Sequence, residues 1–537
     1  MRRPPGSARR LREVVEAFMV EGLQVPLARM RVTSCASLAC RVHCTWARWT
    51  GRRPTGMSWQ VAVRDALVRL GPAFVKVGQI LSVRADLVPR ELASALRTLQ
   101  SDVPPVPLDA VRPVIEAALK KPLDVSFRRF EERPLAAGSL AQVHVAELAD
   151  GRRVAVKVKR PGTDARVRED LTILRWLAEE LERRVPESHP YRPVAAAAEL
   201  ERYTLRELDF RNEARVSRDL RDAHAGDARV RIPEVHLATA DVLVMEFVES
   251  FPLDDVAAIA EHGLDRRTLV RAGLDVVLAE LFEFGLFHGD PHPGNLHVTP
   301  TGKIVLLDFG IHGRLDERVQ RDCALLVWML SRGDTDLASF YLLRLARLTD
   351  DADVDGFRRA IEARYAAWRG TTLAEYGFAR LLYEELTLGA SHGVILPSEL
   401  LLLAKALVTV EGVARALEPD LDVAREVRPY LERVHARFFS VERLRDGLVR
   451  ALPLWWDVAE RLPAEVAERL DRSLTMRGER AAPSAPPLAP ALVAAAMILA
   501  GAGLLAAAGD PEPHHRAIVG ALALLAGLVA GLRAVAR

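Results

Sequence analysis

Cysteine is scarce in this chain of 537 residues, which contains only Cys35, Cys40, Cys44 and Cys323. So few cysteines exclude a disulfide framework in a chain of this size, and a reducing compartment is the expectation. Three of them lie close to His43 in the sequence, but no CxxC pair is present. We therefore expect small buried thiols on a helix rather than a metal site.

Net charge is also almost absent, at +2, which argues against nucleic acid as the main partner. Basic residues do cluster, at Arg9, Arg10 and Arg12 and again between positions 41 and 53. Such runs are typical of a solvated face, and an anionic membrane surface is the functional alternative. The N-terminus has no apolar signal-peptide core, and its glutamates and low serine content disfavour a mitochondrial transit peptide.

Charge is missing from two stretches near the C-terminus, 488–509 and 517–532, which a polar turn at 510–516 separates. The first is long enough to cross a hydrocarbon core and the second is slightly short. Together they predict a transmembrane hairpin, and the alternative is a buried helical hairpin in a soluble domain. Arginines on both flanks predict that the C-terminus and the bulk of the protein are cytoplasmic.

The chain is organised around the stretch FHGDPHPGNLHVTPTGKIVLLDFG, residues 287–310. Asn295 follows Asp290 by five positions, and Asp308 opens a DFG sequence thirteen positions later. Protein kinases have this order in the catalytic loop and the DFG segment. There the first aspartate orients the acceptor hydroxyl, while the asparagine and the DFG aspartate hold magnesium through oxygen ligands.

The alternative for this stretch is a polar loop between helices, followed by a buried strand KIVLLDF. Three polar anchors at two correct offsets, with an apolar strand between them, favour the kinase-like interpretation. We therefore predict Asp290 as the catalytic carboxylate, with Asn295 and Asp308 as ligands of Mg²⁺.

Residues 125–160 predict strands around a turn of small residues, followed by a strand with alternating valines that contains Lys157. Its V-A-x-K form resembles the kinase lysine that pairs with phosphates and with a helix glutamate. The alternative is an exposed strand lysine. A kinase would carry GxGxxG in the turn. The residues here are Ala136, Ala137, Gly138 and Ser139, and we expect their backbone amides and the serine hydroxyl to meet phosphate oxygens.

Two further helical segments carry candidate polar groups. In the segment 67–105, Lys76 and Gln79 share a helix face, and Gly78 between them indicates close packing. These residues alone favour solvated surface. An apolar stripe on the same segment is interrupted at a Gly-Pro pair. Its members are Leu67, Leu70, Phe74, Val77 and Leu81.

The charged helical segment 164–223 contains Glu207, Asp209 and Glu213, for which surface salt bridges are the alternative. Glu213 lies one turn beyond Asp209 on the same face. Two short strands follow, and the second leads into Glu246 and Val248 at the position of a kinase hinge, whose backbone would bond adenine. After residue 310 the pattern predicts helices to about residue 474, with no APE-type motif.

The assembled pattern resembles the UbiB (AarF-like) atypical kinase family over roughly residues 60–420 and the C-terminal hairpin. The segments that carry the resemblance are KVGQ (76–79), the Ala loop with the following AQVH, VAVKVKRPG, ELDFRNEA, LVMEFVES, HGDPHPGN and LDFGIHGRL. The KxGQ helix and the Ala loop separate this family from ordinary protein kinases.

The resemblance implies an α+β, protein-kinase-like two-lobed fold that is mostly helical, with an N-terminal helical extension over the cleft and a C-terminal transmembrane helical hairpin. It implies that Lys157 pairs with Glu213 and with the α- and β-phosphates of ATP or ADP bound with Mg²⁺. It also implies that Lys76 of the KxGQ motif reaches toward Glu207 and Asp209, where a protein substrate would otherwise sit.

The implied function is an atypical kinase or ATPase in the metabolism of ubiquinone or other isoprenoid lipids, with ATP binding and ATPase behaviour more evident than protein phosphorylation. The implied partners are membrane lipids, an isoprenoid lipid or quinone-biosynthesis proteins, and the implied location is the cytoplasmic side of the inner membrane. Many members have a third alanine where Gly138 stands, and we expect the glycine to loosen the loop.

Two other functions stay open at this point. HGDPHPGN also fits small-molecule phosphotransferases of the aminoglycoside or choline kinase type, although these lack the KxGQ helix and the membrane hairpin. The second is a nucleotide-gated scaffold that does not turn over ATP. The predicted segments are a basic helical region 1–58, a KxGQ extension 59–124, an N-lobe 125–250, a C-lobe 251–420, C-terminal helices 421–477, a Pro/Ala linker 478–487 and the hairpin 488–537.

Overall fold

The computed structural model describes residues 8–21, 23–30, 32, 36, 58–83, 88–96, 98–99, 104–332, 334–368, 382–384, 388–419, 423–438 and 449. The chain divides into two compact units, Met1–Glu432 and Arg433–Arg537, and the first contains every element up to α19 (Ser398–Leu417) and the start of α20 (Val423–Phe438). The predicted cysteine cluster, the 478–487 linker and the 488–537 hairpin lie outside the described residues. Within the described ranges no helix combines the length and the apolar character needed to span a bilayer.

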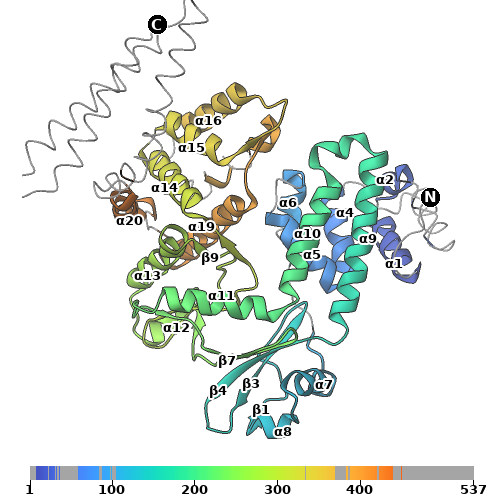
Figure 1. The fold of residues 1–537 in the computed structure, drawn as a ribbon, viewed down its shortest axis with the longest axis vertical. Coiled ribbons are helices and arrows are strands. Elements are labelled where there is room, and N and C mark those ends of the chain that lie inside the picture. Colours follow the sequence, from blue (N-terminus) through green and yellow to red (C-terminus); the bar gives the residue numbers. More distant parts are fainter. Residues whose placement is uncertain are drawn as a thin grey trace, which may run out of the picture. The chain divides into compact units, whose positions relative to one another are not determined.

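A helical layer forms the N-terminal part of the first unit (Figure 1). Here α9 and α10 pack side by side, and α4, α5 and α6 pack against one another. The predicted break falls between α4 and α5, where Gly71 has a φ of +95°. The bounds are α1 Ala8–Val20, α2 Gln24–Arg29, α4 Trp59–Leu70, α5 Pro72–Val83, α6 Arg90–Leu96, α9 Thr163–Arg184, the short 3-10 helix Pro186–Tyr191 and α10 Pro193–Glu207.

The predicted apolar stripe is confirmed, because Leu67, Leu70, Phe74 and Val77 are buried. The close packing predicted at Gly78 is confirmed as well. A Cβ there would lie 2.3 Å from the Leu99 Cδ1 atom, so any larger residue would displace its neighbours.

Arg10 contradicts the expectation that the N-terminal basic run is a solvated face. Its guanidinium is buried and donates to both carboxylate oxygens of Asp170 on α9, at 2.6 and 3.1 Å, and to the carbonyl of Leu70 at 3.0 Å. Arg9, one residue earlier, is exposed. A charge count in the sequence does not reveal which arginine the helix turns inward, and α1 turns this one onto a buried acid.

A six-stranded antiparallel sheet follows, in the order β1-β3-β4-β7-β6 with β2 added beside β3. Its valines pack on α7 and α8 on one face, and α11 covers Ala141 and Leu243 on the other. The predicted strands are confirmed except at the start, where 125–126 end α8. The bounds are α7 Leu108–Leu119, α8 Leu123–Ser126, β1 Arg129–Phe130, β2 Ala136–Ala137, β3 Ala141–Glu147, β4 Arg153–Lys159, α11 Phe210–Ala223, β6 Val235–Ala238 and β7 Val242–Glu246.

The remainder of the first unit is mainly helical, with short strands at the turns that position the site. The strands β5, β11, β10 and β8 form a second sheet in that order, and β9 pairs with β12. The bounds up to the site are β5 Val230–Arg231, β8 Phe251–Pro252, α12 Val256–Glu261, α13 Arg266–Ala279, a π-helical turn Glu280–Phe284, β9 Leu286–His288, β10 Leu296–Val298, β11 Ile304–Leu306 and β12 His312–Arg314.

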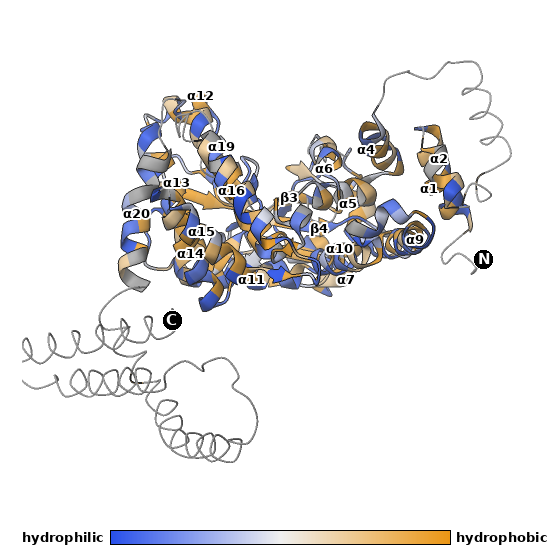
Figure 2. Ribbon diagram, turned by 90° about the horizontal axis from the view of Figure 1, so that it is seen from above, coloured by the Kyte–Doolittle hydropathy of each residue, from blue (hydrophilic) through white to orange (hydrophobic). Residues whose placement is uncertain are grey.

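The prediction of helices alone after residue 310 is wrong at three strands, because β12 pairs with β9, and β13 with β14. These two-residue and three-residue strands form through distant partners, which local sequence does not show. Figure 2 shows hydrophobic and hydrophilic residues mixed along the helices, as expected where one side is buried. The bounds are α14 Glu317–Arg332, α15 Thr335–Leu345, β13 Arg347–Leu348, α16 Val354–Trp368, a 3-10 helix Gly389–His392, β14 Val394–Ile395, α19 Ser398–Leu417 and α20 Val423–Phe438.

Candidate active site

His288 links the two halves of the central motif. At the end of β9 its Nε2 atom donates to the carbonyl of Leu307 at 2.9 Å, and its Nδ1 atom accepts from the amide of Asp290 at 3.1 Å. One donor and one acceptor define a neutral imidazole. The ring is buried, and the backbone amide of His288 donates to the buried carboxylate of Glu280. His288 therefore fixes the start of the Asp290 loop against the residue that precedes Asp308.

The β10–β11 hairpin brings Asn295 and Asp308 to the same end. Leu296 pairs with Leu306, and the amide of Leu307 donates to the carbonyl of Asn295 at 2.8 Å. Asn295 therefore stands opposite the residue just before Asp308. The side-chain amide of Asn295 also donates to the backbone carbonyl of Asp290, at 3.2 Å. Asp290, Asn295 and Leu307, the residue just before Asp308, thus meet around one hairpin end.

Asp308 has an unusual backbone, with a φ of +53°. This left-handed conformation is uncommon for residues other than glycine, and aspartate tolerates it through local hydrogen bonds. Here the Oδ1 atom accepts from the amide of Gly310 at 3.1 Å. The ring of Phe309 is buried beside His288. The buried ring holds the turn, while the Asp308 side chain is 48% exposed and open to a ligand.

Lys157 joins the sheet to this turn. Its Nζ atom lies 2.8 Å from both carboxylate oxygens of Glu213 on α11 and 3.2 Å from Oδ1 of Asp308. The ring of Phe210, at the start of α11, lies 5.4 Å from the ammonium. The structure therefore brings Lys157, Glu213 and Asp308 into one cluster. The alternatives of an exposed strand lysine and a surface glutamate are wrong, because both side chains are largely buried.

Burial shifts the charges of this cluster. Burial opposes the charge of Lys157, but the carboxylates of Asp308 and Glu213 outweigh it, so the pKa of Lys157 is raised. Burial also raises the pKa of Glu213, to about 7, in spite of the neighbouring lysine, and the charge of Asp308 adds to that rise. Lys157 therefore stays charged, because two acids share one base.

The acidic pair Glu207 and Asp209 separates because a helix break falls between them, with Glu207 at the end of α10 and Asp209 just before α11. Glu207 lies beside the Asp308 turn, since a Cβ on Gly310 would be 3.7 Å from its Oε1 atom. Asp209 instead caps α11 by accepting from the amide of Arg211 at 3.0 Å and pairs with that guanidinium at 2.7 Å. The pair therefore has one member at the site and one member in a helix cap.

The KxGQ residues lie on α5, as predicted. Gln79 is half-buried, and its Nε2 atom donates to the carbonyl of Leu99 at 3.3 Å, so the expectation of solvated surface is wrong for it. The side chain of Lys76 lies outside the described part of the structure. Its predicted approach to Glu207 and Asp209 stays a prediction.

The Ala loop forms a tight turn. Ala136 and Ala137 make up β2, and the amide of Gly138 donates to the carbonyl of Ala141 at 2.8 Å, with Ser139 inside the turn. A Cβ on Gly138 would lie 3.6 Å from that carbonyl, which is ordinary contact. The turn therefore has room for an alanine at position 138, the residue that many members of the UbiB family have there.

At the predicted hinge, Glu246 ends β7. Its amide donates to the carbonyl of Glu234 at 2.8 Å, and its carboxylate accepts from Arg231 and from the amide of Glu234. The carbonyl of Val248 accepts from the hydroxyl of Ser250 at 3.2 Å. The Glu246 side chain thus serves the sheet edge, and only backbone groups there would be offered to an adenine.

Sequence reasoning missed Lys405. Its Nζ atom on α19 lies 2.8 Å from Oδ1 of Asp290, whereas the Nε2 atom of His292 is 4.0 Å from the other carboxylate oxygen. Burial opposes the charge of Asp290, but Lys405 outweighs it and the pKa of Asp290 is lowered. The apolar run LLLLAKALV offers one signal, a lone lysine amid core residues.

The donor set fits a magnesium ion held together with phosphates. Among the described residues no three His, Cys, Asp or Glu side chains are grouped for a metal. Asp308 and Asn295 supply one exposed carboxylate and one amide oxygen at the same hairpin end. Because Mg²⁺ in nucleotide sites takes one or two protein ligands and fills the rest with phosphates and water, two suffice.

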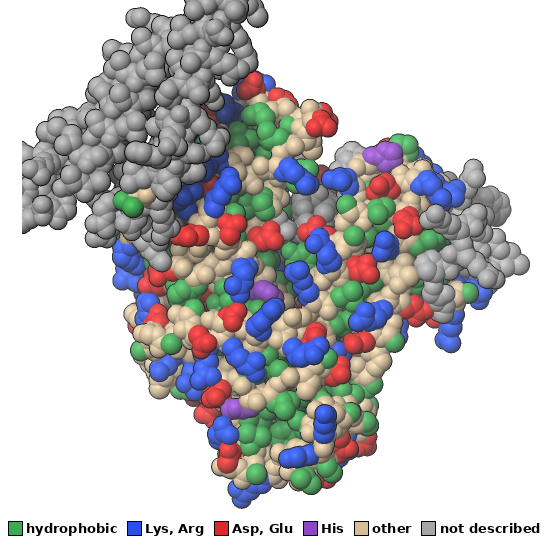
Figure 3. Space-filling model, in the orientation of Figure 1, with side chains coloured by type: hydrophobic (Ala, Val, Ile, Leu, Met, Phe, Trp, Pro, Cys, Tyr) green, Lys and Arg blue, Asp and Glu red, His purple; other side chains and the backbone are tan. Residues whose placement is uncertain are grey.

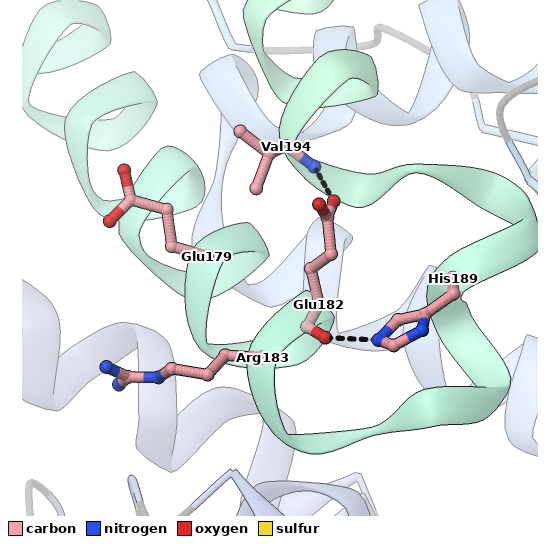
Figure 4. A pocket seen from close by; sticks show the side chains of 5 residues that line it. All are labelled: Glu179, Glu182, Arg183, His189 and Val194. Atoms are coloured by element: carbon pink, nitrogen blue, oxygen red, sulfur yellow. Dashed lines mark hydrogen bonds between the residues drawn. The ribbon is translucent and has the colours of Figure 1, made fainter.

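A separate shallow hollow of about 400 Å³ lies between α9 and α10 (Figure 4). Its polar groups are used locally: Glu182 accepts from the amide of Val194 at 2.9 Å, and His189 donates to the carbonyl of Glu182 at 2.7 Å. These contacts close the α9–α10 connection. On the face shown in Figure 3, acidic and basic side chains are interspersed rather than gathered by sign.

Comparisons with known proteins point to one family. Residues 98–341 match the ABC1 atypical kinase-like domain, and residues 363–422 match the UbiB helical domain. "Probable protein kinase UbiB" of Marinobacter nauticus is 32% identical over 414 residues, which cover 76% of each chain. The protein of the same name from Aeromonas hydrophila is 32% identical over 429 residues and 79% of each chain.

A third relative of that name, from Xanthomonas axonopodis pv. citri, is 34% identical over 405 residues, which cover 73% of this chain and 72% of that one. Among solved structures, a Mycobacterium tuberculosis protein in complex with erythromycin is 25% identical and aligns with a TM-score of 0.44. The alignment covers 65% of this chain and 88% of the mycobacterial chain.

Proposed function

This chain belongs to the UbiB family of atypical kinases, and on that premise we propose that it is an ATP- and Mg²⁺-dependent kinase or ATPase that supports the biosynthesis of ubiquinone or another isoprenoid quinone. The observation that carries the proposal is the meeting of Lys157, Asp308 and Asn295 around one hairpin end. A cation, a carboxylate and an amide oxygen are the groups that hold a magnesium–nucleotide complex.

Each residue has a separate task in this proposal. Magnesium, when bound, would neutralise phosphate charge, and the oxygens of Asn295 and Asp308 would hold it. Lys157, kept in place by Glu213, binds phosphate oxygens. Asp290 lies on the other side of His288 and orients the attacking hydroxyl or water by accepting its hydrogen bond. Catalysis then rests on positioning and charge, which need no covalent intermediate.

The test is ATP turnover by the full-length protein in detergent or liposomes. Asp308→Asn keeps the size of the side chain and removes its charge, so turnover should fall by about 100-fold or more. Asp150→Asn is the matched control, because Asp150 lies in an exposed turn and pairs with Arg152. Full turnover by Asp308→Asn would refute the mechanism.

One observation favours a second candidate, a nucleotide-gated scaffold. The carboxylate of Asp290 is engaged by Lys405, which leaves it less available to an acceptor. On this reading the protein binds nucleotide and changes its partners without transferring phosphate. Measuring quinone levels in a deletion strain decides between the two, because Asp290→Ala restores them if the scaffold suffices and fails to do so if turnover is needed.

We further propose an inner-membrane location with the kinase-like part on the cytoplasmic side, supported by the uncharged runs 488–509 and 517–532. Extraction of membranes with alkaline carbonate tests this. The wild-type chain should stay with the membrane pellet, and Leu525→Arg should weaken its retention. Release of the wild-type chain into the supernatant would count against anchoring.

A further inference from the structure

The catalytic loop is covered by a helix from outside the kinase-like stretch. The helix α19 falls within residues 363–422, the part of the chain that matches a separate helical domain. Leu402 packs on Gly289, where a Cβ would lie 2.9 Å from its Cδ2 atom. Lys405 follows one turn later on the same face and reaches Asp290. The two contacts together set the helix directly on the loop.

The ammonium of Lys405 has unused bonding capacity. It offers three donors, and among the described residues only the carboxylate of Asp290 forms an ion pair with it. The side chain is 22% exposed, so water or a ligand can reach it. Two other basic side chains of the site are less suited to accompany Asp290. Lys157 is paired with both carboxylate oxygens of Glu213, and the Nε2 atom of His292 is 4.0 Å from the Asp290 carboxylate.

We propose that Lys405 is an active-site lysine contributed by the helical domain, which positions the carboxylate of Asp290 and donates its remaining N–H groups to the terminal phosphate of ATP. The inference rests on the proposed function, because it assumes that a nucleotide occupies the site. It assigns the helical domain a direct part in the site. Without α19 the loop would keep its carboxylate and lose the cation beside it.

The physical argument is one of charge. ATP places a γ-phosphate on the acceptor side of the site, where ADP has no phosphate, so a lysine there would contact ATP and not ADP. Lys157 contacts the inner phosphates in this proposal and would serve both nucleotides equally. Loss of Lys405 should therefore weaken the binding of ATP and leave that of ADP almost unchanged. A lysine that only docks α19 would affect the binding of both nucleotides alike.

The experiment compares binding of Mg·ATP and Mg·ADP to the full-length protein by calorimetry, together with turnover and thermal unfolding without nucleotide. Lys405→Met should lower the affinity for Mg·ATP about tenfold, because a hydrogen bond to a charged group is lost, while the affinity for Mg·ADP should change by less than about twofold. Turnover should fall about 100-fold. Lys405→Arg should recover part of both effects. Lys303→Met is the control, since Lys303 is exposed at the far end of the β10–β11 hairpin.

The outcomes separate this inference from the proposed function. Equal losses for ATP and ADP, or none, would overturn the role of Lys405 and leave the function standing. A wild-type protein that binds nucleotide without turnover would refute the proposed enzymatic activity. The ratio of ATP affinity to ADP affinity in the variants would still decide the role of Lys405. A wild-type protein that binds neither nucleotide would overturn both. If Lys405→Met unfolds early, Lys405→Gln provides the same comparison.

Discussion

Replacing Gly289 with alanine tests how tightly α19 is set on the catalytic loop. The new Cβ would lie 2.9 Å from Cγ2 of Ile311 and 2.9 Å from Cδ2 of Leu402. Carbon atoms rest at about 3.5–4.0 Å, so each neighbour must yield by roughly 0.6 Å or more. The φ of Gly289 is outside the left-handed region, so the expected cost arises from packing and not from the backbone.

Overpacking of this kind costs about 1–3 kcal/mol. For a unit of this size the melting temperature should fall by about 1–3 °C, measured by the intrinsic fluorescence of the full-length protein in detergent. Turnover should fall as well, because a shift of α19 moves Lys405 away from Asp290. Gly226→Ala is the matched control, since a Cβ there meets no atom within 4 Å.

A second substitution makes the reasoning refutable. Leu402→Ala removes one of the two clashing side chains and leaves a cavity that the Cβ of Gly289→Ala can partly fill. The double variant should therefore be more stable than the sum of the single changes predicts, by about 1 kcal/mol. A melting temperature unchanged in Gly289→Ala, or strictly additive effects, would show that α19 is not seated on the loop as described.

Two further predictions concern ion pairs that hold helices onto the first unit. Asp170→Ala should destabilise the protein by about 3 kcal/mol in thermal unfolding, because it leaves the buried guanidinium of Arg10 without its main partner; Arg9→Ala, at an exposed position, should change little, and equal effects of the two would contradict the assignment. Glu426 of α20 accepts from two arginines of α13, and these bonds lower its pKa to about 2. Because the folded pKa is depressed, its stabilisation is present above the ordinary value near 4.5 and is lost as pH falls toward 2. Because both arginines are more than half exposed, solvent weakens the ion pairs, and we expect Glu426 to contribute about 1–2 kcal/mol to the free energy of unfolding at pH 7. The gap in melting temperature between wild type and Glu426→Gln should narrow as the pH falls from 7 to 3, and a constant gap would refute the pairing.

Local sequence was sufficient for the elements whose signal lies within one segment. The valine alternation around Lys157, the Gly71 break and the close packing at Gly78 are each the property of one short stretch. The hairpin that joins Asn295 to Asp308 belongs with them, because its apolar strands lie between the two residues in the sequence. Local patterns work here because the partners are near in the chain.

Long-range partners were not predictable in the same way. Arg10 and Asp170 are 160 residues apart, and their pairing turns an ordinary basic run into a buried contact. The strands β12, β13 and β14 each need a distant partner to be strands at all. Asp209 is a different case, because a helix start and an arginine two residues later, and not a distant partner, take it away from the site.

The amino-acid sequence by itself determined the kinase-like class of the protein and identified the acidic and amide groups of its site. It could do so because Asp290, Asn295 and Asp308 lie within one continuous loop and hairpin, where their spacing is visible. Only the tertiary structure decided that Lys405 accompanies Asp290 and that Glu207, but not Asp209, stands at the Asp308 turn. The reason is physical: a charge finds its partner through space, and the packing of helices such as α19 sets which charges meet.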